Sequence, residues 1–355
     1  MTLVLHDYVT QRGGAERVAL LLAERLGGGE LTTSVYVPEE THVGFSAIKV
    51  HELLGRSPTA VKRSRTALAP LAAAAFLKHK QVADVVLCSS SGWSHWTSSQ
   101  SPSVVYCYTP PRWAWAPEDY FRGMPSIVRA LTPTVSRGLA VVDRRQAAAR
   151  NRYIAISSTT RERIRHAYGV DADIVPPPVT LTVEGDEESV EDLQPGFVLT
   201  ISRARGYKNA GLAQASFRNG SSGQLVIVGG EVARKDGHIL QLGRVSDAQL
   251  RWLYRHCRAV LALSHEDFGL TPVEGHLFGK PTIALRAGGY LDTCREDENA
   301  VWVKRLDIAE VQDAVARADR ARWNADEIRQ SARLFSVEAF ISRMSDVLDE
   351  VRSSA

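Results

Sequence analysis

The sequence predicts an α/β protein made of two doubly wound, Rossmann-like domains that face a cleft. Its 355 residues are enough for two domains, each with a core of its own. In both halves, short apolar runs typical of buried strands alternate with segments typical of helices, which favours parallel sheets covered on both faces. A proline-rich break at Pro176–Pro178 separates the two halves, so we expect each half to form one domain.

The first domain is expected over residues 1–180. A helix is predicted from Ala15 to about Leu26, and a second from Ser158 to Tyr168, where Gly169 supplies a stop. The predicted core strands are Leu3–Leu5, Val85–Cys88, Val104–Cys107 and Tyr153–Ile156.

The second domain is expected over residues 181–335. It opens with an acidic stretch, Glu184–Asp192, whose few apolar residues indicate an exposed connection. Asp247–His256 is a predicted helix. The predicted strands are Phe197–Ile201, Leu225–Val228, Ile239–Leu242, Ala259–Leu263 and Thr282–Leu285.

A last helix is predicted from Ser336 to about Val351, because its apolar residues recur on one stripe. Such a stripe needs a surface to cover. We therefore expect residues 336–355 to pack back on the N-terminal domain.

Composition indicates a cytoplasmic protein. No apolar stretch approaches the roughly 20 residues that span a bilayer, and the first residues lack the basic start and apolar core of a signal peptide. The four cysteines are widely spaced, which predicts reduced thiols in or near the cores and argues against a metal site. They are Cys88, Cys107, Cys257 and Cys294.

Charge divides unevenly between the halves. Residues 1–180 carry 21 Lys and Arg against 14 Asp and Glu, whereas residues 181–355 carry 22 against 26. Basic residues gather at 62–65 and 144–152. They form either solvated helix faces or a surface for an anionic partner, such as peripheral contact with the inner face of a membrane. Nucleic acid is not expected as a partner, because aromatic residues are not interleaved with these clusters.

The segment His265–Glu274 is the strongest candidate for a ligand site. It follows a predicted strand and leads into a helix start, with Thr271 as the expected N-cap, Pro272 at the first helical position and Glu274 three residues after the cap. Carboxylates suit the hydroxyls of a ligand and free helix amides suit phosphates, so a nucleotide sugar fits. The alternative is structural: Glu274 closes a capping box and Glu266 is a solvated residue at a strand end.

Two further segments of the second domain point to the same ligand. Arg203 and Lys208 follow the strand that ends at Ile201, and two cations there can clamp a diphosphate; a solvated turn is the alternative. The loop Leu242–Asp247, which contains Val245, is a candidate for contact with the nucleotide base.

In the first domain, residues at predicted strand ends are candidates for the acceptor side. Gly13 and Gly14 allow a ligand to approach the backbone at a helix start, or form a tight turn only. The aromatic run Tyr106–Trp115, with Arg112 and Trp113, forms an acceptor wall or fills the face between the domains. His95 either is a core or surface residue or reaches the cleft.

Taken together, these segments resemble family 4 of the retaining glycosyltransferases, which have the two-domain GT-B fold. Any one of them is weak, but the order is specific, and the opening stretch is most similar to bacterial mannosyl- and rhamnosyltransferase-like members. The matching segments are His6–Arg17, Tyr106–Trp115, Ile174–Val179, Arg203–Lys208, Leu242–Asp247 and Glu266–Glu274, followed by Gly279–Pro281 and Gly288–Gly289.

The resemblance implies a role for each matching residue. Arg203 and Lys208 would hold the diphosphate, Glu266 the hydroxyls of the donor sugar and Glu274 the ribose. Gly14 would admit the donor's phosphate from the first domain. The backbone amides that would meet phosphate and sugar belong to Phe268, Gly269, Leu270 and Thr271.

Such enzymes are thought to react on one face of the sugar, so neither a protein nucleophile, a metal nor a cofactor is implied. The expected reaction moves a hexose or deoxyhexose, with GDP-mannose as the suggested donor, to a polysaccharide, lipid-linked or small-molecule hydroxyl. One departure matters: Tyr108 stands where relatives commonly have a histidine that contacts the donor sugar. A non-catalytic nucleotide-sugar-binding homologue, which Tyr108 favours, and a nucleotide-sugar 2-epimerase of the same architecture are the alternatives.

Overall fold

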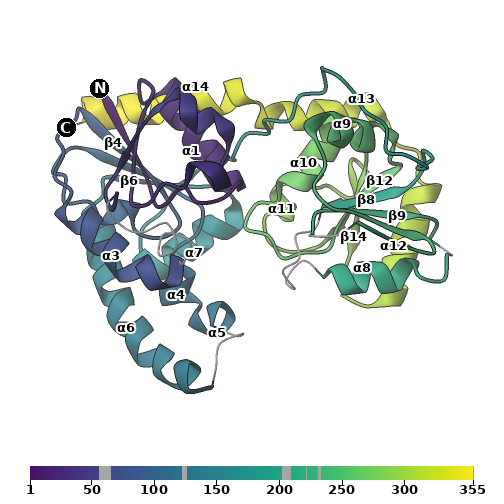
Figure 1. Ribbon diagram of the computed structural model, residues 1–355, viewed down its shortest axis with the longest axis horizontal. Helices are drawn as coiled ribbons and strands as arrows, with labels where there is room; N and C mark the ends of the chain where they lie inside the picture. Colours follow the sequence, from purple (N-terminus) through teal and green to yellow (C-terminus); the bar gives the residue numbers. More distant parts are fainter. Residues whose placement is uncertain (56–64, 122–125, 202–208, 221, 231–232, 355) are drawn as a thin grey trace. The chain divides into compact units, whose positions relative to one another are not determined.

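The computed structural model describes residues 1–55, 65–121, 126–201, 209–220, 222–230 and 233–354. The chain divides into two compact units (Figure 1). Unit 1 comprises Met1–Pro177 and Phe340–Ala355, and unit 2 comprises Pro178–Ala339. Each unit contains a seven-stranded sheet within its described residues. The α/β class and the two Rossmann-like sheets predicted from the sequence are confirmed.

Unit 1 has a fully parallel sheet in the described part of the chain. Its strand order is β3-β2-β1-β4-β5-β6-β7, the doubly wound order in which the chain reverses direction across the sheet beside β1. The strands are β1 (Thr2–His6), β2 (Glu30–Thr33), β3 (Lys49–Glu52), β4 (Val85–Ser90), β5 (Ser103–Cys107), β6 (Arg152–Ala155) and β7 (Asp173–Ile174). The helices are α1 (Gly14–Arg25), α3 (Arg65–Lys78), α4 (Arg112–Trp115), α5 (Pro117–Tyr120), α6 (Ser126–Ala148) and α7 (Ser158–Tyr168), with 3-10 turns η1 (Pro38–Glu40), η2 (Val43–Ala47) and η3 (Ser94–Trp96).

Unit 2 shares six strands of this order, adds an edge strand and, among its described residues, has no counterpart of β7. Its sheet runs β10-β11-β9-β8-β12-β13-β14, and β10 pairs antiparallel to β11 at the edge, a strand that the sequence patterns did not indicate. The strands are β8 (Val198–Ile201), β9 (Leu225–Val228), β10 (Arg234–Asp236), β11 (Ile239–Leu242), β12 (Ala259–Ala262), β13 (Thr282–Leu285) and β14 (Ala300–Val303). The helices are α8 (Ala210–Phe217), α9 (Asp247–His256), α10 (Leu270–Leu277), α11 (Tyr290–Thr293), α12 (Ile308–Arg320) and α13 (Ala325–Ala332), followed by the 3-10 turn η5 (Arg333–Phe335).

The last helix, α14 (Val337–Ser353), lies along unit 1 from Phe340 onward (Figure 1). The Phe340 ring meets Tyr106 edge-on, with centroids 5.5 Å apart. Near its end, Arg352 donates to Thr2 Oγ1 at 2.5 Å and Glu350 pairs with Arg152. This helix therefore joins the chain's last residues to its first strand.

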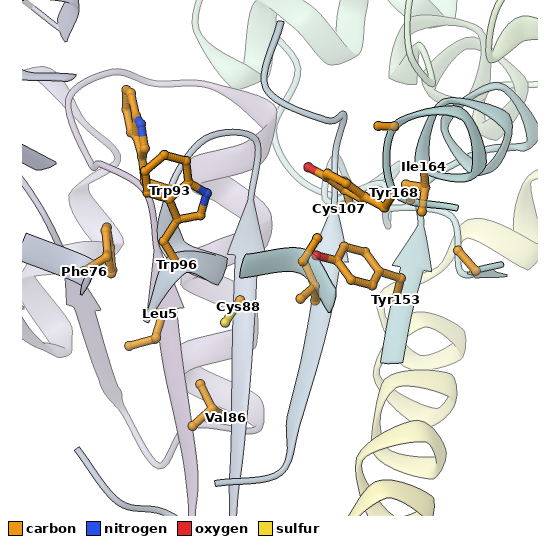
Figure 2. Close-up of a cluster of buried hydrophobic side chains, with 14 of the residues drawn as sticks. Leu5, Phe76, Val86, Cys88, Trp93, Trp96, Cys107, Tyr153, Ile164 and Tyr168 are labelled. Atoms are coloured by element: carbon orange, nitrogen blue, oxygen red, sulfur yellow. The ribbon is translucent and has the colours of Figure 1, made fainter. Parts of the chain in front are cut away.

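The core of unit 1 is a mixed aliphatic and aromatic cluster (Figure 2). Its strands contribute Leu5, Val86 and Cys88, and the rings of Tyr153 and Tyr168 lie 5.4 Å apart. The four cysteines are buried free thiols, as the sequence predicted. Burial raises the pKa of Cys88, Cys257 and Cys294 to about 12 each, which leaves them protonated and unreactive at neutral pH.

Candidate active site

In unit 2, the loop after β12 carries Glu266 and is clamped by two glycines. The Gly289 amide donates to the Glu266 carbonyl at 2.9 Å. A Cβ on Gly288 would lie 2.3 Å from that carbonyl, and one on Gly289 would lie 2.2 Å from Phe268 Cα. Only glycines therefore permit this close approach, which fixes the backbone of Glu266 and buries Phe268.

Helix α10 begins two residues earlier than expected, and its cap is different. Gly269 is the N-cap, with φ of 84° and ψ of 87°, and no side chain caps the helix. The prediction of Thr271 as N-cap is therefore wrong: the chain turns into the helix at a glycine in the left-handed region, and the Tyr290 ring fills the space where a Cβ would be. The first amides of α10 begin at Leu270, at a helix end that attracts anions.

Glu274 has a partner that the sequence did not reveal. Its Oε2 accepts from the Tyr254 hydroxyl at 2.6 Å, so the capping box expected with Thr271 is not formed. Tyr254 lies fully buried on α9 and its ring stacks on Phe278. Burial, and then the charge of Glu274, raise the pKa of Tyr254, so the phenol stays a hydrogen-bond donor. Glu274 is thereby held in a fixed orientation while half-buried.

Of the predicted phosphate clamp and base contact, the structure describes only the base contact, Val245. Arg203 and Lys208 lie outside the described residues. Val245 is half-buried in the turn before α9. The next residue, Ser246, caps α9 through a reciprocal capping box with Gln249, which fixes this turn at the helix start.

In unit 1, the candidate residues gather at the carboxyl ends of β1, β4 and β5, which are neighbouring parallel strands. Gly13 is the N-cap of α1 and Gly14 is its exposed first residue. A Cβ on Gly13 would lie 2.1 Å from Glu16 Oε2, so the buried carboxylate of Glu16 requires glycine there. Space for a neighbouring side chain thus explains Gly13, and Gly14 leaves the helix start open.

The Tyr108 hydroxyl is tied to this same helix start. It donates to the Ala15 carbonyl at 3.1 Å and lies 2.9 Å from Ser89 Oγ, which lies 2.9 Å from His6 Nδ1. Burial raises the pKa of Tyr108 well above its ordinary value, so the phenol is neutral. Tyr108 therefore connects the ends of three strands with α1.

His95 lies in the interior of unit 1, not at its surface. It is 2% exposed, with Nδ1 3.0 Å from Ser90 Oγ and Nε2 2.9 Å from Asp143 Oδ1. This supports the core alternative for His95. Direct contact with an acceptor would need the side chain to leave these partners.

Asp143, on α6, gathers the aromatic residues around His95. Its carboxylate accepts from the indoles of Trp96 and Trp115, each at 2.7 Å, and from the Tyr168 hydroxyl at 2.9 Å. Burial alone would raise the pKa of Asp143, but the interactions with His95, Trp115 and Trp96 outweigh burial and lower it. A charged carboxylate therefore anchors this aromatic cluster.

The aromatic run ends in a partly open face. Trp113 is half-buried and stacks on Trp93, with ring centroids 5.8 Å apart and planes 13° apart. Arg112 opens α4 and is exposed. Trp113 therefore serves the core of unit 1 with one face, and Arg112 with Trp113 remains the candidate for contact with an acceptor.

Within the ranges that the structure describes, no three or more His, Cys, Asp or Glu side chains are grouped as metal ligands. None of the described helices combines the length and the apolarity needed to cross a bilayer.

Two family models match the chain in succession. The model described as Glycosyltransferase Family 4 matches residues 12–183, and the model described as Glycosyl transferases group 1 matches residues 184–334. The boundary between them lies close to the division between the two units.

Curated relatives match over shorter lengths. Over 179 residues the chain is 31% identical to the D-rhamnosyltransferase WbpZ of Pseudomonas aeruginosa, covering 46% of each protein. Over 129 residues it is 27% identical to the alpha-1,3/1,6-mannosyltransferase ALG2 of Rhizomucor pusillus, covering 34% of this chain and 27% of that protein. The chain thus spans less than half the length of these relatives.

Solved structures share the fold over the whole chain. Sucrose-phosphate synthase from Thermosynechococcus elongatus superposes with a TM-score of 0.73 at 16% identity, covering 100% of both chains. Anabaena HepE in complex with UDP and glucose superposes with a TM-score of 0.72 at 15% identity, covering 98% of this chain and 99% of that one. At these identities the likeness establishes the fold alone.

Proposed function

The chain belongs to glycosyltransferase family 4 and has the GT-B fold, and from this premise we propose that it transfers a hexose or deoxyhexose from a nucleoside-diphosphate sugar to a hydroxyl group. The observation that carries the proposal is the clamped loop after β12. It holds Glu266 directly before the N-terminus of α10, so a carboxylate for sugar hydroxyls and amides for phosphate lie in one short segment.

The remaining donor contacts are proposed from the resemblance of the matching segments to the family. Glu266 binds hydroxyls of the sugar, and Glu274, held by Tyr254, binds the ribose. Arg203 and Lys208 neutralise the diphosphate, whose charge grows as it leaves. Val245 lies beside the base, and Gly14 opens the start of α1 to the donor's phosphate.

We propose that the reaction retains the configuration at the anomeric carbon. The bond from that carbon to the phosphate oxygen breaks, the acceptor oxygen bonds to the carbon on the same face, and the acceptor's proton passes to the departing phosphate. A reaction of this kind needs neither a protein nucleophile nor a metal ion. The protein contributes position and charge, the two largest sources of catalysis for such a transfer.

The donor sugar and acceptor are proposed from the relatives and from charge. The curated relatives include a rhamnosyltransferase and mannosyltransferases, so GDP-mannose is the first donor to test. One structural neighbour was solved with UDP-glucose, which makes UDP donors the second choice. The basic first half of the chain favours an anionic acceptor, such as a lipid-linked or polysaccharide intermediate at the inner face of a membrane.

The test is release of nucleoside diphosphate from GDP-mannose, UDP-glucose and TDP-rhamnose, with and without a chelator. We expect at least one donor to be cleaved, cleavage to survive chelation, and Glu266→Ala to slow it about 10- to 100-fold, the range for losing a charged hydrogen bond. Binding without release would instead support a non-catalytic homologue. An epimerised nucleotide sugar would indicate a 2-epimerase, and loss of activity in chelator would refute the metal-independent reaction.

A further inference from the structure

Tyr290 lies beneath the candidate donor loop and is anchored in the core of unit 2. It is 2% exposed and belongs to a buried cluster with Ala262, Leu285 and Trp302, at the carboxyl ends of neighbouring strands. Its ring occupies the space next to Gly269, where a Cβ would lie 2.2 Å from ring carbon Cε1. Packing from two sides therefore fixes the position of its hydroxyl.

That hydroxyl is the first member of a hydrogen-bonded chain that ends on Glu266. Tyr290 Oη lies 2.8 Å from Ser264 Oγ, and Ser264 Oγ donates to Glu266 Oε1 at 3.0 Å. A serine hydroxyl has one proton, and Ser264 gives it to the carboxylate. The bond between the two hydroxyls must then use the proton of Tyr290, so every donor in the chain points toward Glu266.

This direction distinguishes the chain from ordinary core packing. A carboxylate accepts but does not donate, so the proton that Ser264 presents to Glu266 can orient that side chain. Successive hydrogen bonds that point the same way polarise one another and strengthen the last of them. Because Ser264 is itself 5% exposed, little water competes for these bonds.

We propose that Tyr290 is a positioning residue of the donor site: through Ser264 it fixes the rotamer of the Glu266 carboxylate, so that this carboxylate faces the sugar hydroxyls of the donor. This inference rests on the proposed function, because Glu266 needs orientation only if it contacts a sugar. Tyr290 touches no substrate in this arrangement. Its effect therefore falls on recognition of the sugar, not on binding of the nucleotide.

The experiment compares Tyr290→Phe and Ser264→Ala with the full-length wild-type protein. Tyr290→Phe keeps the ring beside Gly269 and removes only the hydroxyl. Binding of the nucleotide sugars used above and of GDP, UDP and TDP is measured by calorimetry, together with donor cleavage. We expect either variant to weaken cleavage or nucleotide-sugar affinity about tenfold, the effect of one hydrogen bond, while nucleoside-diphosphate affinity stays within about twofold.

Two comparisons separate orientation of Glu266 from a structural effect. Tyr153→Phe is the matched control, because the Tyr153 hydroxyl is buried without a hydrogen-bond partner and lies in unit 1. It should leave donor cleavage unchanged. In the second comparison, adding Tyr290→Phe to Glu266→Ala should cost nothing further, since the hydroxyl acts through that carboxylate.

Three results would overturn the proposal. The first is a Tyr290→Phe protein with the donor cleavage and nucleotide-sugar affinity of wild type. The second is a Tyr290→Phe protein whose affinities for nucleoside diphosphate and nucleotide sugar fall equally. The third is a loss of donor cleavage in the double variant that equals the sum of the two single losses. A wild-type protein that cleaves its donor while Tyr290→Phe is unaffected refutes the positioning role and leaves the proposed function standing. A wild-type protein that neither binds nor cleaves any donor refutes both.

Discussion

At the scale of single residues, Tyr108 illustrates how one side chain can join several segments. Its hydroxyl connects β4, through Ser89, with the first turn of α1, through the Ala15 carbonyl. The donor and acceptor capacity of a phenol is fully used by these two bonds. A role in holding the start of α1, next to Gly14, therefore accounts for a tyrosine at this position.

We predict that Tyr108→Phe destabilises unit 1 by about 1–2 kcal/mol, because the half-buried Ala15 carbonyl and the buried Ser89 hydroxyl each lose a partner. Thermal unfolding should show a fall of roughly 2–8 °C in the transition of unit 1. Tyr153→Phe removes a buried hydroxyl that has no partner and should leave this transition unchanged or slightly higher. Equal shifts in the two variants would contradict this account of Tyr108.

His276 makes the stability of unit 2 depend on pH. It is fully buried on α10, its Nε2 lies 3.1 Å from Thr282 Oγ1, and its Nδ1 has no partner. Burial lowers the pKa of His276 to about 4 from 6.5. As pH falls below about 6.5, His276 binds a proton in the unfolded chain but stays neutral in the folded protein. The free energy of unfolding of unit 2 therefore falls by about 3 kcal/mol by pH 4.

Denaturant unfolding between pH 4 and 7.5 tests this sign. In His276→Gln the stability of unit 2 should change less over this range, because the amide does not titrate and can still bond Thr282. His265→Gln, at an exposed histidine of the same unit, should keep the wild-type slope. A wild-type protein whose unit 2 is equally stable at pH 4 and 6.5 would contradict the prediction.

Residue patterns also explain why part of the candidate site was predicted and part was not. Glu266 and Glu274 were found because a strand, a loop and a helix start follow each other in sequence. The partners Tyr254 and Tyr290 lie on other helices, and only the fold brings them to these carboxylates. Thr271 matched the usual capping signature, but a glycine in the left-handed region outweighed it.

At the scale of elements, the loop after β12 and the turn before α11 form one clamped pair. Gly289 has φ of −68°, a conformation open to any residue, so its need for glycine is purely steric. The backbone of Phe268 occupies the place that a Cβ on Gly289 would take.

We predict that Gly289→Ala costs more than about 2 kcal/mol and abolishes donor cleavage, because backbone cannot yield as a flexible side chain does. Gly211→Ala, in α8, meets no atom within 4 Å and should stabilise unit 2 by up to about 1 kcal/mol. Melting temperature and nucleoside-diphosphate release report both effects. A Gly289→Ala protein with wild-type activity would show that the loop does not need this contact.

Local signals decided which elements could be predicted. Helices α7 and α9 have the predicted bounds, since Ser157 and Ser246 cap their starts and Gly169 ends α7 in the left-handed conformation. Strand β10 was not predicted, because Arg234–Asp236 is polar and exposed and shows no apolar pattern. Helix α6 was not predicted, because Pro133 lies inside it and a proline within a helix usually breaks it.

At the scale of the whole molecule, each unit has the same central strand order around its first strand, β1 or β8. Alternating apolar runs were enough to predict two such sheets, because a buried parallel strand must be apolar on both faces. The place of α14 depends on more than its stripe. Its buried residues include Phe340, Met344 and Leu348, and its contacts with Tyr106 and Thr2 lie in unit 1.

We therefore predict that deletion of residues 340–355 unfolds unit 1 and spares unit 2. Burying each large apolar side chain of α14 contributes about 1.5–3 kcal/mol, and five of them are buried, so the loss exceeds about 5 kcal/mol and approaches the whole stability of a domain. Residues 178–339 expressed alone should fold, since the Val179 amide donates to the Phe335 carbonyl at 2.8 Å and closes that unit on itself. Hydrogen exchange of the deletion protein should show protection confined to β8–β14 and their helices; protected amides in β1, β4 and β5 would contradict the assignment of α14 to the core of unit 1.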